Sequence, residues 1–373
     1  MAGQRVNLGK IVLFGSGETS ASGRAIHDHL MAELPRPVVV AILETPAGFQ
    51  PNSEHVAGEV AEFITARLQN YQPEVRIIPA RKKGTLFSPD DPLLLEPMLD
   101  ANYVFLGPGS PTYAARNLED TLALEYVLER HKAGAVLCFA SAATLAVGAK
   151  VLPVYEIFKA GSDLYWADGL NVFASFGLDL AIVPHWNNTD GGVHLDTSHC
   201  FMGQRRMEQL KQLLPASTAL LGIDEHTALV FDFQQGRGLV LGKGTVTIGF
   251  DSKEKAYSAG DSFALGDLGP YHLPPDVIRS RPPPTAASKR PPSAPVALPP
   301  DVAQLINLRE DARRSQDWAE ADALRQRIAD MGFEVQDTHQ GPRWRHRGEK
   351  AKALFRPGSA HGPGGRWRRT SPR

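Results

Sequence analysis

The stretch Val136-Leu137-Cys138-Phe139-Ala140-Ser141-Ala142-Ala143-Thr144 decides the predicted fold. Its first half is an apolar run of strand length, and its second half is a helix-like stretch of small residues. Ser141 lies at the junction of the two. A serine on a tight turn between a central parallel strand and a helix is exposed at the edge of the sheet, as a nucleophile must be. The alternative is that Ser141 only caps the following helix.

Apolar runs of strand length alternate with helical patterns from Lys10 to about Phe250. The predicted strands cover residues 11–14, 38–43, 75–78, 103–106, 135–139, 180–183, 218–221, 228–231, 238–242 and 245–248. The predicted helices include residues 22–34, 53–69, 118–133 and 204–214. This alternation predicts an α/β fold with a doubly wound, mostly parallel sheet that is covered by helices on both faces. Ligands bind such sheets at the carboxyl ends of the strands.

The composition divides the chain into further segments. We assign residues 1–268 to the α/β domain and the proline-rich residues 269–299 to an extended linker. Residues 300–347 regain helical periodicity and predict a helical hairpin that turns at Asp317-Trp318. Its predicted apolar stripe comprises Leu305, Leu308, Ala312, Trp318, Ala321, Leu324 and Ile328. Residues 348–373 are predicted to form a disordered basic tail.

Charge, cysteines and hydropathy narrow the class of protein. The 373 residues carry a net charge of −1, so the overall charge favours no class of partner. The two cysteines, Cys138 and Cys200, are too few for a disulfide framework and have no metal-ligand spacing. No apolar run approaches the roughly 20 residues of a membrane span, and the N-terminus does not resemble a signal peptide. We therefore expect a cytoplasmic protein without a metal site or membrane contact, and its oligomeric state stays open.

A nucleophilic serine needs a base and an acid at neighbouring strand ends. Pro184 ends the predicted strand 180–183 and leaves His185 in the loop at its carboxyl edge. His199 is a second candidate base, just before a predicted helix. For the acid, Glu225 follows the predicted strand 218–221, and Glu156 is a rival.

Two glycine-rich turns follow predicted strands and provide backbone N–H groups for an oxyanion. Gly107-Pro108-Gly109-Ser110 follows strand 103–106, and Gly15-Ser16-Gly17-Glu18 follows the first strand. Neither turn has the Gly-Lys-Ser/Thr of a P-loop or the three-glycine dinucleotide fingerprint. We therefore expect no cofactor.

Taken in order, these segments resemble the serine peptidase family that contains alpha-aspartyl dipeptidase and cyanophycinase. The resemblance covers about residues 10–251, and it implies a flavodoxin-like fold similar to that of class I glutamine amidotransferases. The matching elements, in chain order, are Gly107–Ser110, Ser141-Ala142-Ala143-Thr144, Pro184-His185-Trp186, Arg205-Arg206 and Asp224-Glu225-His226-Thr227-Ala228.

The resemblance implies a role for each matching residue. Ser141 would be the nucleophile, His185 the general base and Glu225 the acid behind it. The backbone N–H groups of Gly109 and Ala142 would form the oxyanion hole. His199 stays an alternative base, because its separation from Glu225 along the chain also fits the family.

The same resemblance implies which residues contact the substrate. It also shows where this sequence differs from the family's motif. Ser110, Arg205 and Arg206 are the expected substrate-binding residues, with an arginine on a substrate carboxylate. Ser110 replaces the family's asparagine. Phe139 and Ala143 replace glycines on either side of the nucleophile, and the expected effect of a phenylalanine there is to reshape the elbow or to reduce access to it.

The C-terminal segment carries a second resemblance. Residues 312–325, then Met331-Gly332-Phe333-Glu334-Val335-Gln336-Asp337-Thr338 and Gly341-Pro342-Arg343-Trp344, closely resemble the end of bacterial cysteinyl-tRNA synthetases. There the unit belongs to the tRNA-facing region. None of the synthetase's ATP-binding motifs occurs in this sequence, so we do not expect aminoacylation.

Two functions follow from the sequence. The first is a serine hydrolase that cleaves an amide bond in a small peptide or amino-acid conjugate. The second is a non-catalytic binding protein whose C-terminal hairpin and basic tail contact tRNA or another RNA. Trp344 and Trp367, which lie among arginines, suit such contact. A hairpin that packs on a protein partner or on the α/β domain is the alternative for the C-terminal segment.

Overall fold

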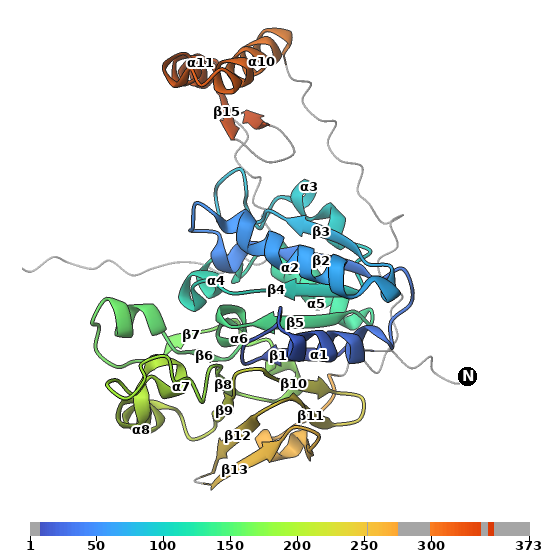
Figure 1. Cartoon of the computed structure of the whole chain (residues 1–373), viewed down its shortest axis with the longest axis vertical. Helices are drawn as coiled ribbons and strands as arrows, with labels where there is room; N and C mark the ends of the chain where they lie inside the picture. The colour runs from blue at the N-terminus through green and yellow to red at the C-terminus, as the bar shows by residue number, and fades with distance from the viewer. Residues whose placement is uncertain (1–7, 252, 275–298, 337–341, 347–373) are drawn as a thin grey trace, which may run out of the picture. The chain divides into compact units, whose positions relative to one another are not determined.

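The computed structural model describes residues 8–251, 253–274, 299–336 and 342–346 (Figure 1). The chain divides into two compact units, Met1–Arg290 and Pro291–Arg373. Most of the predicted linker and all of the predicted basic tail lie outside the described residues, so the domain boundaries stay a prediction. Residues 269–274, placed in the linker by their composition, include Tyr271, whose ring stacks on Phe233 of the first unit with the ring centroids 6.5 Å apart.

The larger sheet of the first unit holds eight strands in the order β14-β11-β10-β1-β5-β4-β2-β3 (Figure 1). Its strands are β1 (Ile11–Phe14), β2 (Val39–Leu43), β3 (Glu74–Ile78), β4 (Tyr103–Leu106), β5 (Val136–Ala140), β10 (Thr227–Asp232), β11 (Arg237–Gly242) and β14 (Ser262–Ala264). The pairs from β1 across to β3 are parallel, and β10, β11 and β14 add antiparallel pairs.

The second sheet holds six strands in the order β13-β12-β9-β8-β6-β7. They are β6 (Lys150–Val151), β7 (Ala167–Asp168), β8 (Leu180–Val183), β9 (Ala219–Ile223), β12 (Thr245–Phe250) and β13 (Lys253–Ser258). The predicted α/β fold is confirmed, but its strands are shared between two sheets. The chain crosses from one sheet to the other between β5 and β6, β9 and β10, β11 and β12, and β13 and β14.

Helices and the second sheet cover the two faces of the larger sheet. The helices of this unit are α1 (Ala21–Met31), α2 (Ser53–Arg67), α3 (Pro92–Leu95), α4 (Pro111–Leu118), α5 (Leu122–Lys132), α6 (Ala142–Ala146), α7 (Ser198–Phe201) and α8 (Gly203–Leu213). Val12 and Phe14 pack with residues of α1 and α2, whereas Ile11 and Leu13 pack toward α5 and the second sheet. Burial on both faces explains the unbroken apolar strands.

The predicted helix 118–133 is divided between α4 and α5. Thr121 interrupts it, because its side chain accepts a hydrogen bond from the backbone of Leu124 and caps α5. Asp120 just before it has a φ of 53°. A left-handed residue followed by a capping threonine ends one helix and begins the next.

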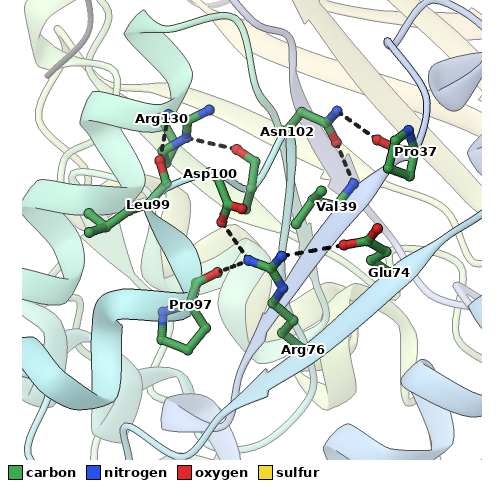
Figure 2. A network of polar contacts seen from close by, with 10 residues as sticks. Pro37, Val39, Glu74, Arg76, Pro97, Leu99, Asp100, Asn102 and Arg130 are labelled. Atoms are coloured by element: carbon green, nitrogen blue, oxygen red, sulfur yellow. Dashed lines mark hydrogen bonds and ion pairs between the residues drawn. The ribbon is translucent and has the colours of Figure 1, made fainter. Parts of the chain in front are cut away.

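Polar side chains close the amino ends of β2, β3 and β4 (Figure 2). The Asn102 side chain accepts a hydrogen bond of 2.9 Å from the backbone N–H of Val39. Arg76 forms an ion pair with Asp100, and Arg130 on α5 donates to two carbonyl groups of the loop before β4. The candidate functional site lies at the opposite edge of the sheet, which is formed by the carboxyl ends of the parallel strands.

The C-terminal unit contains the predicted helical hairpin. Its helices are α10 (Pro300–Arg314) and α11 (Trp318–Asp330), and a two-stranded sheet of β15 (Phe333–Gln336) and β16 (Arg343–His346) follows. The Asp317 carboxylate accepts a hydrogen bond of 3.0 Å from the backbone of Glu320 and caps α11. The hairpin and its turn are confirmed, and the two strands were not predicted.

Two members of the predicted apolar stripe are exposed. Leu308 is 45% exposed and Trp318 is 57% exposed, whereas Val302 and Ile306 are buried in their place. The stripe was wrong at these two positions, and the core of this unit also contains Phe333 and Val335 of β15. Among the described residues, no helix is long and apolar enough to cross a membrane, and no metal-binding cluster occurs.

Thr144 ties α6 to the ends of two central strands. It is fully buried, and its hydroxyl lies 2.9 Å from the carbonyl oxygen of Phe14 and 2.8 Å from that of Phe139. The hydroxyl hydrogen is shared between carbonyl groups at the ends of β1 and β5, so it fixes the turn that carries Ser141.

Replacing Thr144 with Val removes this donor and keeps the side-chain volume. We expect the free energy of unfolding to decrease by about 1–3 kcal/mol, because buried carbonyl groups lose their partner. The shift of the urea midpoint measures this. Thr247→Val, at a half-buried position of β12, is the matched control and should change stability by less than about 0.5 kcal/mol. A Thr144→Val protein as stable as the wild type would contradict this role.

Candidate active site

The register of the parallel strands brings three loops together. Phe14 of β1 lies opposite Ala140 of β5, and Leu106 of β4 lies opposite Phe139. The glycine turns that follow β1 and β4 therefore leave the sheet on either side of Ser141. This is the carboxyl edge at which ligands bind in such folds.

Gly15 joins the two sheets at this edge. Its N–H group donates a hydrogen bond of 2.8 Å to the carbonyl of Thr227 on β10, and its carbonyl accepts one of 3.1 Å from the N–H group of His185 after β8. A Cβ atom at Gly15 would lie 2.0 Å from the carbonyl oxygen of Asp224. Only glycine fits this close approach of three chain segments.

Ser141 occupies a strained turn between β5 and α6. Its φ of 51° and ψ of −110° are unusual for a residue with a side chain, at a cost on the order of 1–3 kcal/mol. Its side chain makes no capping hydrogen bond to α6. Instead, the Ser141 Oγ lies 3.2 Å from the Nε2 atom of His185. The hydroxyl is therefore directed at the imidazole rather than used as a helix cap.

His185 connects Ser141 to Glu225. The parallel pair β8 and β9 places Val183 opposite Gly222, so the loops that carry His185 and Glu225 leave the second sheet side by side. The Nδ1 atom of His185 lies 2.9 Å from Glu225 Oε1. Because a carboxylate only accepts hydrogen bonds, Nδ1 carries the proton and Nε2 is free to accept the hydrogen of the Ser141 hydroxyl.

Two asparagines after Trp186 hold Glu225, Asn188 through the carboxylate and Asn187 through the backbone, and neither was predicted from the sequence. The Asn188 side chain donates to Glu225 Oε1 at 3.2 Å, and the Glu225 N–H group donates to the Asn187 side chain at 2.8 Å. The hydrogen bond from His185, and to a lesser degree that from Asn188, holds the pKa of Glu225 below its ordinary value. The paired asparagines directly after Pro184-His185-Trp186 were the available signal.

Two backbone N–H groups in the turns around Ser141 donate no hydrogen bond within the described part of the chain. Ala142 is the first residue of α6, so its N–H group has no partner within the helix. Within the described residues, the Gly109 N–H group donates no hydrogen bond either. Gly109 has a φ of +149°, and a Cβ atom there would lie 1.9 Å from the carbonyl oxygen of Pro46. Glycine is therefore required for this loop to pass so close.

The two residues beside Ser141 that differ from the family's motif are buried in the core. Phe139 and Ala143 are each 1% exposed and belong to the apolar cluster between the sheets. Strand alternation turns the Phe139 side chain toward that core, and its effect on the shape of the elbow stays a prediction. Ser110 is also buried, and its hydroxyl caps α4 by accepting a hydrogen bond of 3.2 Å from the backbone of Tyr113.

The alternative base, His199, contacts Trp186 and Ser198 instead of Ser141. Its ring meets the Trp186 ring edge-on at 4.1 Å, and its Nδ1 atom lies 2.9 Å from the Ser198 Oγ. Burial lowers the pKa of His199. The geometry thus brings His185, and not His199, to the candidate nucleophile.

α7 is a left-handed turn that supports the His185 loop. The φ angles of His199, Cys200 and Phe201 are 55°, 57° and 69°. The Cys200 N–H group donates a hydrogen bond of 3.1 Å to the carbonyl of His185. Residues in such conformations cost energy and persist where the surrounding contacts require them.

The expected substrate-binding arginines differ in their surroundings. The Arg206 Nε atom donates to the carbonyl of Met202 at 2.6 Å, and its Nη2 atom donates to that of Phe201 at 2.9 Å. These two hydrogen bonds connect the end of the left-handed turn to α8, which carries Arg206. Arg205 is exposed on the surface of α8.

Two further carboxyl groups lie near the site. The rival acid Glu156 accepts a hydrogen bond of 2.5 Å from the Thr112 hydroxyl, whereas Glu225 is the carboxylate on His185. Glu18, in the glycine turn after β1, interacts electrostatically with His185, and burial raises its pKa above the ordinary value. The sequence analysis noted the turn that holds Glu18 but not this role.

A solved structure shares the fold of the first unit. The chain resembles a peptidase from an acI-B1 actinobacterium with a TM-score of 0.56 and 22% sequence identity. The match covers 70% of this chain and 98% of that protein. It confirms the fold that the sequence resemblance implied.

The C-terminal unit matches a different group of proteins. Residues 296–345 match the family described as the cysteinyl-tRNA ligase anticodon binding domain. The cysteine–tRNA ligase of Thermus thermophilus is 48% identical over 44 residues, which cover 12% of this chain and 9% of the ligase. That of Salmonella agona is 47% identical over 47 residues, which cover 13% of this chain and 10% of the ligase. This chain therefore spans about a tenth of these ligases, and its C-terminal unit is similar to their anticodon-binding domain.

Proposed function

We propose that this protein is a serine hydrolase that cleaves an amide bond in a small peptide or amino-acid conjugate. The observation that carries the proposal is the hydrogen-bonded series from Ser141 through His185 to Glu225, with distances of 3.2 Å and 2.9 Å. A nucleophile, a base and an orienting acid in this order are what acyl transfer to serine requires. The fold shared with a solved peptidase supports a hydrolase.

The reaction would proceed through an acyl-enzyme. Ser141 Oγ attacks the amide carbon, its proton passes to His185 Nε2, and the carbonyl electron pair becomes an oxyanion that the N–H groups of Gly109 and Ala142 stabilise. Collapse breaks the carbon–nitrogen bond, and His185 returns the proton to the leaving amine. A water molecule then gives a proton to His185 and attacks the ester, which releases the acid and restores Ser141. Glu225 stabilises the imidazolium in both steps.

A fluorophosphonate probe tests the nucleophile directly. We expect the wild-type protein to be labelled on Ser141 and the Ser141→Ala variant to lose all labelling, because the probe reacts only with an activated serine. Intact-protein mass spectrometry measures the adduct. Ser198→Ala is the matched control, since Ser198 also lies 2.9 Å from a histidine nitrogen and should not be the labelled residue. Unchanged labelling of Ser141→Ala would contradict the proposal.

The lowered pKa of Glu225 makes the stability of the folded protein depend on pH. Because its pKa is lowered, its interactions stabilise the folded protein above the ordinary value of 4.5 and are lost as the pH falls through the lowered pKa. The stability difference between the wild type and Glu225→Gln should therefore be constant above about pH 5.5 and shrink in more acidic solution. Urea midpoints from pH 3 to 8 measure it.

Glu62→Gln, a change at an exposed position of α2, is the control and should show no such trend. A difference that stays the same from about pH 5.5 down to pH 3 would contradict a lowered pKa of Glu225.

The match to an anticodon-binding domain supports a second activity, and we propose that the C-terminal unit contacts tRNA. Trp318 is 57% exposed, and the Arg313 guanidinium lies 5.8 Å from its ring centre. An exposed indole beside a cation suits stacking on a base and contact with a phosphate.

The tRNA proposal predicts salt-dependent binding. The full chain should bind tRNA with an affinity that falls steeply as salt is raised from about 50 to 200 mM, because phosphate contacts release counterions. A chain that ends at residue 299 should lose this binding. Filter binding at several salt concentrations measures both. A flat salt response, or equal binding by the shortened chain, would argue against RNA contact.

A further inference from the structure

A buried ion pair lies beyond the carboxyl ends of β2 and β3. The side chain of Glu44, the residue that follows β2, is 1% exposed, and its Oε2 atom accepts a hydrogen bond of 2.6 Å from the Nε atom of Arg81. The same oxygen accepts one of 2.9 Å from the hydroxyl of Ser53 at the start of α2. A buried carboxylate persists where such partners compensate its charge. Neither member of the pair takes part in the acyl transfer proposed above.

Glu44 leads directly into the segment that contacts Gly109. In the short helix η1 (Thr45–Ala47), the carbonyl oxygen of Pro46 accepts a hydrogen bond of 3.0 Å from the N–H group of Ser110. A Cβ atom at Gly109 would lie 1.9 Å from the same oxygen. The Pro46 carbonyl therefore lies directly against Gly109, and a shift of this carbonyl would turn the N–H group of the candidate oxyanion donor.

Arg81 is connected to both sides of the turn that carries Gly109. Its side chain binds the residue after β2, and its carbonyl oxygen accepts a hydrogen bond of 3.0 Å from the hydroxyl of Tyr113 on α4, the helix that follows the turn. The Thr45 hydroxyl donates to the carbonyl of Ala80, directly before Arg81, at 2.5 Å. The contacts of this segment therefore enclose the turn from β2 and from α4.

Packing alone does not fix the same turn. A cavity of about 10 Å³ lies between β2, α2 and the turn, and its lining includes Glu44, Ser53, Gly107 and Pro108. This is roughly the space of one water molecule. Because a segment beside free space can shift, its polar contacts decide where it lies. The ion pair is the charged contact among them.

We propose that Glu44 and Arg81 are positioning residues for the candidate oxyanion hole. Their ion pair fixes the carbonyl of Pro46, and that carbonyl sets the direction of the Gly109 N–H group. The inference rests on the proposed hydrolase function and extends it to two residues that do not touch the reacting atoms. Such a role matters for the rate, because removing one oxyanion donor slows acyl transfer about 100- to 1000-fold.

The labelling rate with the fluorophosphonate probe measures this role. The double variant Glu44→Gln/Arg81→Met removes both charges together, so no buried charge is left without its partner. We expect its labelling rate constant, expressed per folded protein, to fall about 10- to 100-fold, because the oxyanion donor is misplaced. The pH midpoint of the labelling rate should stay that of the wild type, since the contact between Ser141 and His185 is not changed.

Two further variants complete the comparison. Arg76→Met/Asp100→Asn removes an ion pair at the opposite edge of the same sheet and is the matched control, with a change in rate of less than about twofold (Figure 2). Arg81→Lys keeps a cation beside Glu44 but lacks the planar guanidinium, and we expect a rate about two- to fivefold below the wild type. This variant decides the question if the double variant does not fold, and a wild-type rate would then overturn the proposal.

Phosphorus NMR of the labelled protein separates a positioning role from a general loss of stability. A hydrogen bond to the phosphoryl oxygen moves the phosphorus resonance, and the unfolded adduct gives the resonance without this bond. We expect the resonance of the double variant to move toward that of the unfolded adduct, and the resonance of the control to stay with the wild type. A wild-type resonance or a wild-type rate in the double variant would overturn the proposal, and so would a shifted pH midpoint, which would assign the loss to His185.

Hydrogen exchange tests the positioning separately from the chemistry. A wild-type protein that is not labelled would overturn the hydrolase proposal, and the exchange experiment then still applies. Pro108 and Pro111 have no N–H group, so a peptide that covers residues 107–112 carries few amides besides that of Ser110, which donates to Pro46. Mass spectrometry of this peptide should show exchange at least about tenfold faster in the double variant than in the wild type and the control. Faster exchange supports the positioning role, and equal exchange would overturn it.

Discussion

The close approach of three chain segments at Gly15 is the constraint on which the site depends. Its N–H group binds strand β10 of the larger sheet and its carbonyl binds His185 beyond β8 of the smaller one, at 2.8 Å and 3.1 Å. The nucleophile candidate comes from one sheet, the base candidate from the other, and Glu225 from the segment that crosses between them. Because no side chain fits at Gly15, the two sheets meet at the spacing that lets Ser141 and His185 touch.

The rest of the unit stabilises conformations that would otherwise be unfavourable. Ser141 and His185 have φ angles of 51°, and the turn at Cys200 is left-handed. Tertiary hydrogen bonds hold each of them: the hydroxyl of Thr144 bonds to the strand ends beside Ser141, and the Cys200 N–H group bonds to the carbonyl of His185. Strain of this kind is typical of sites that must present a side chain in one orientation. At the opposite edge, the polar network of Asn102 and Arg76 closes the strands (Figure 2).

The sequence predicted the strand ends well, because apolar runs of four or five residues mark buried strands and a proline or glycine marks their ends. It therefore brought Ser141, His185 and Glu225 to one edge. It did not predict the division into two sheets, because apolar periodicity reports burial and not the pairing partner. The left-handed turn at His199 was also missed, since positive φ is uncommon for any residue other than glycine, and cysteine and phenylalanine do not favour it. The burial of the Phe139 side chain in the core was not predicted either, because the face toward which a strand residue points depends on what covers the sheet.

We propose that Ser141, activated by His185, is acylated by the substrate while the N–H groups of Gly109 and Ala142 hold the oxyanion. A crystal structure of the fluorophosphonate adduct tests it most directly. We expect a bond from Ser141 Oγ to phosphorus and a phosphoryl oxygen about 2.7–3.1 Å from the nitrogen atoms of Gly109 and Ala142. An adduct on another residue, or a phosphoryl oxygen that points away from these two groups, would contradict it.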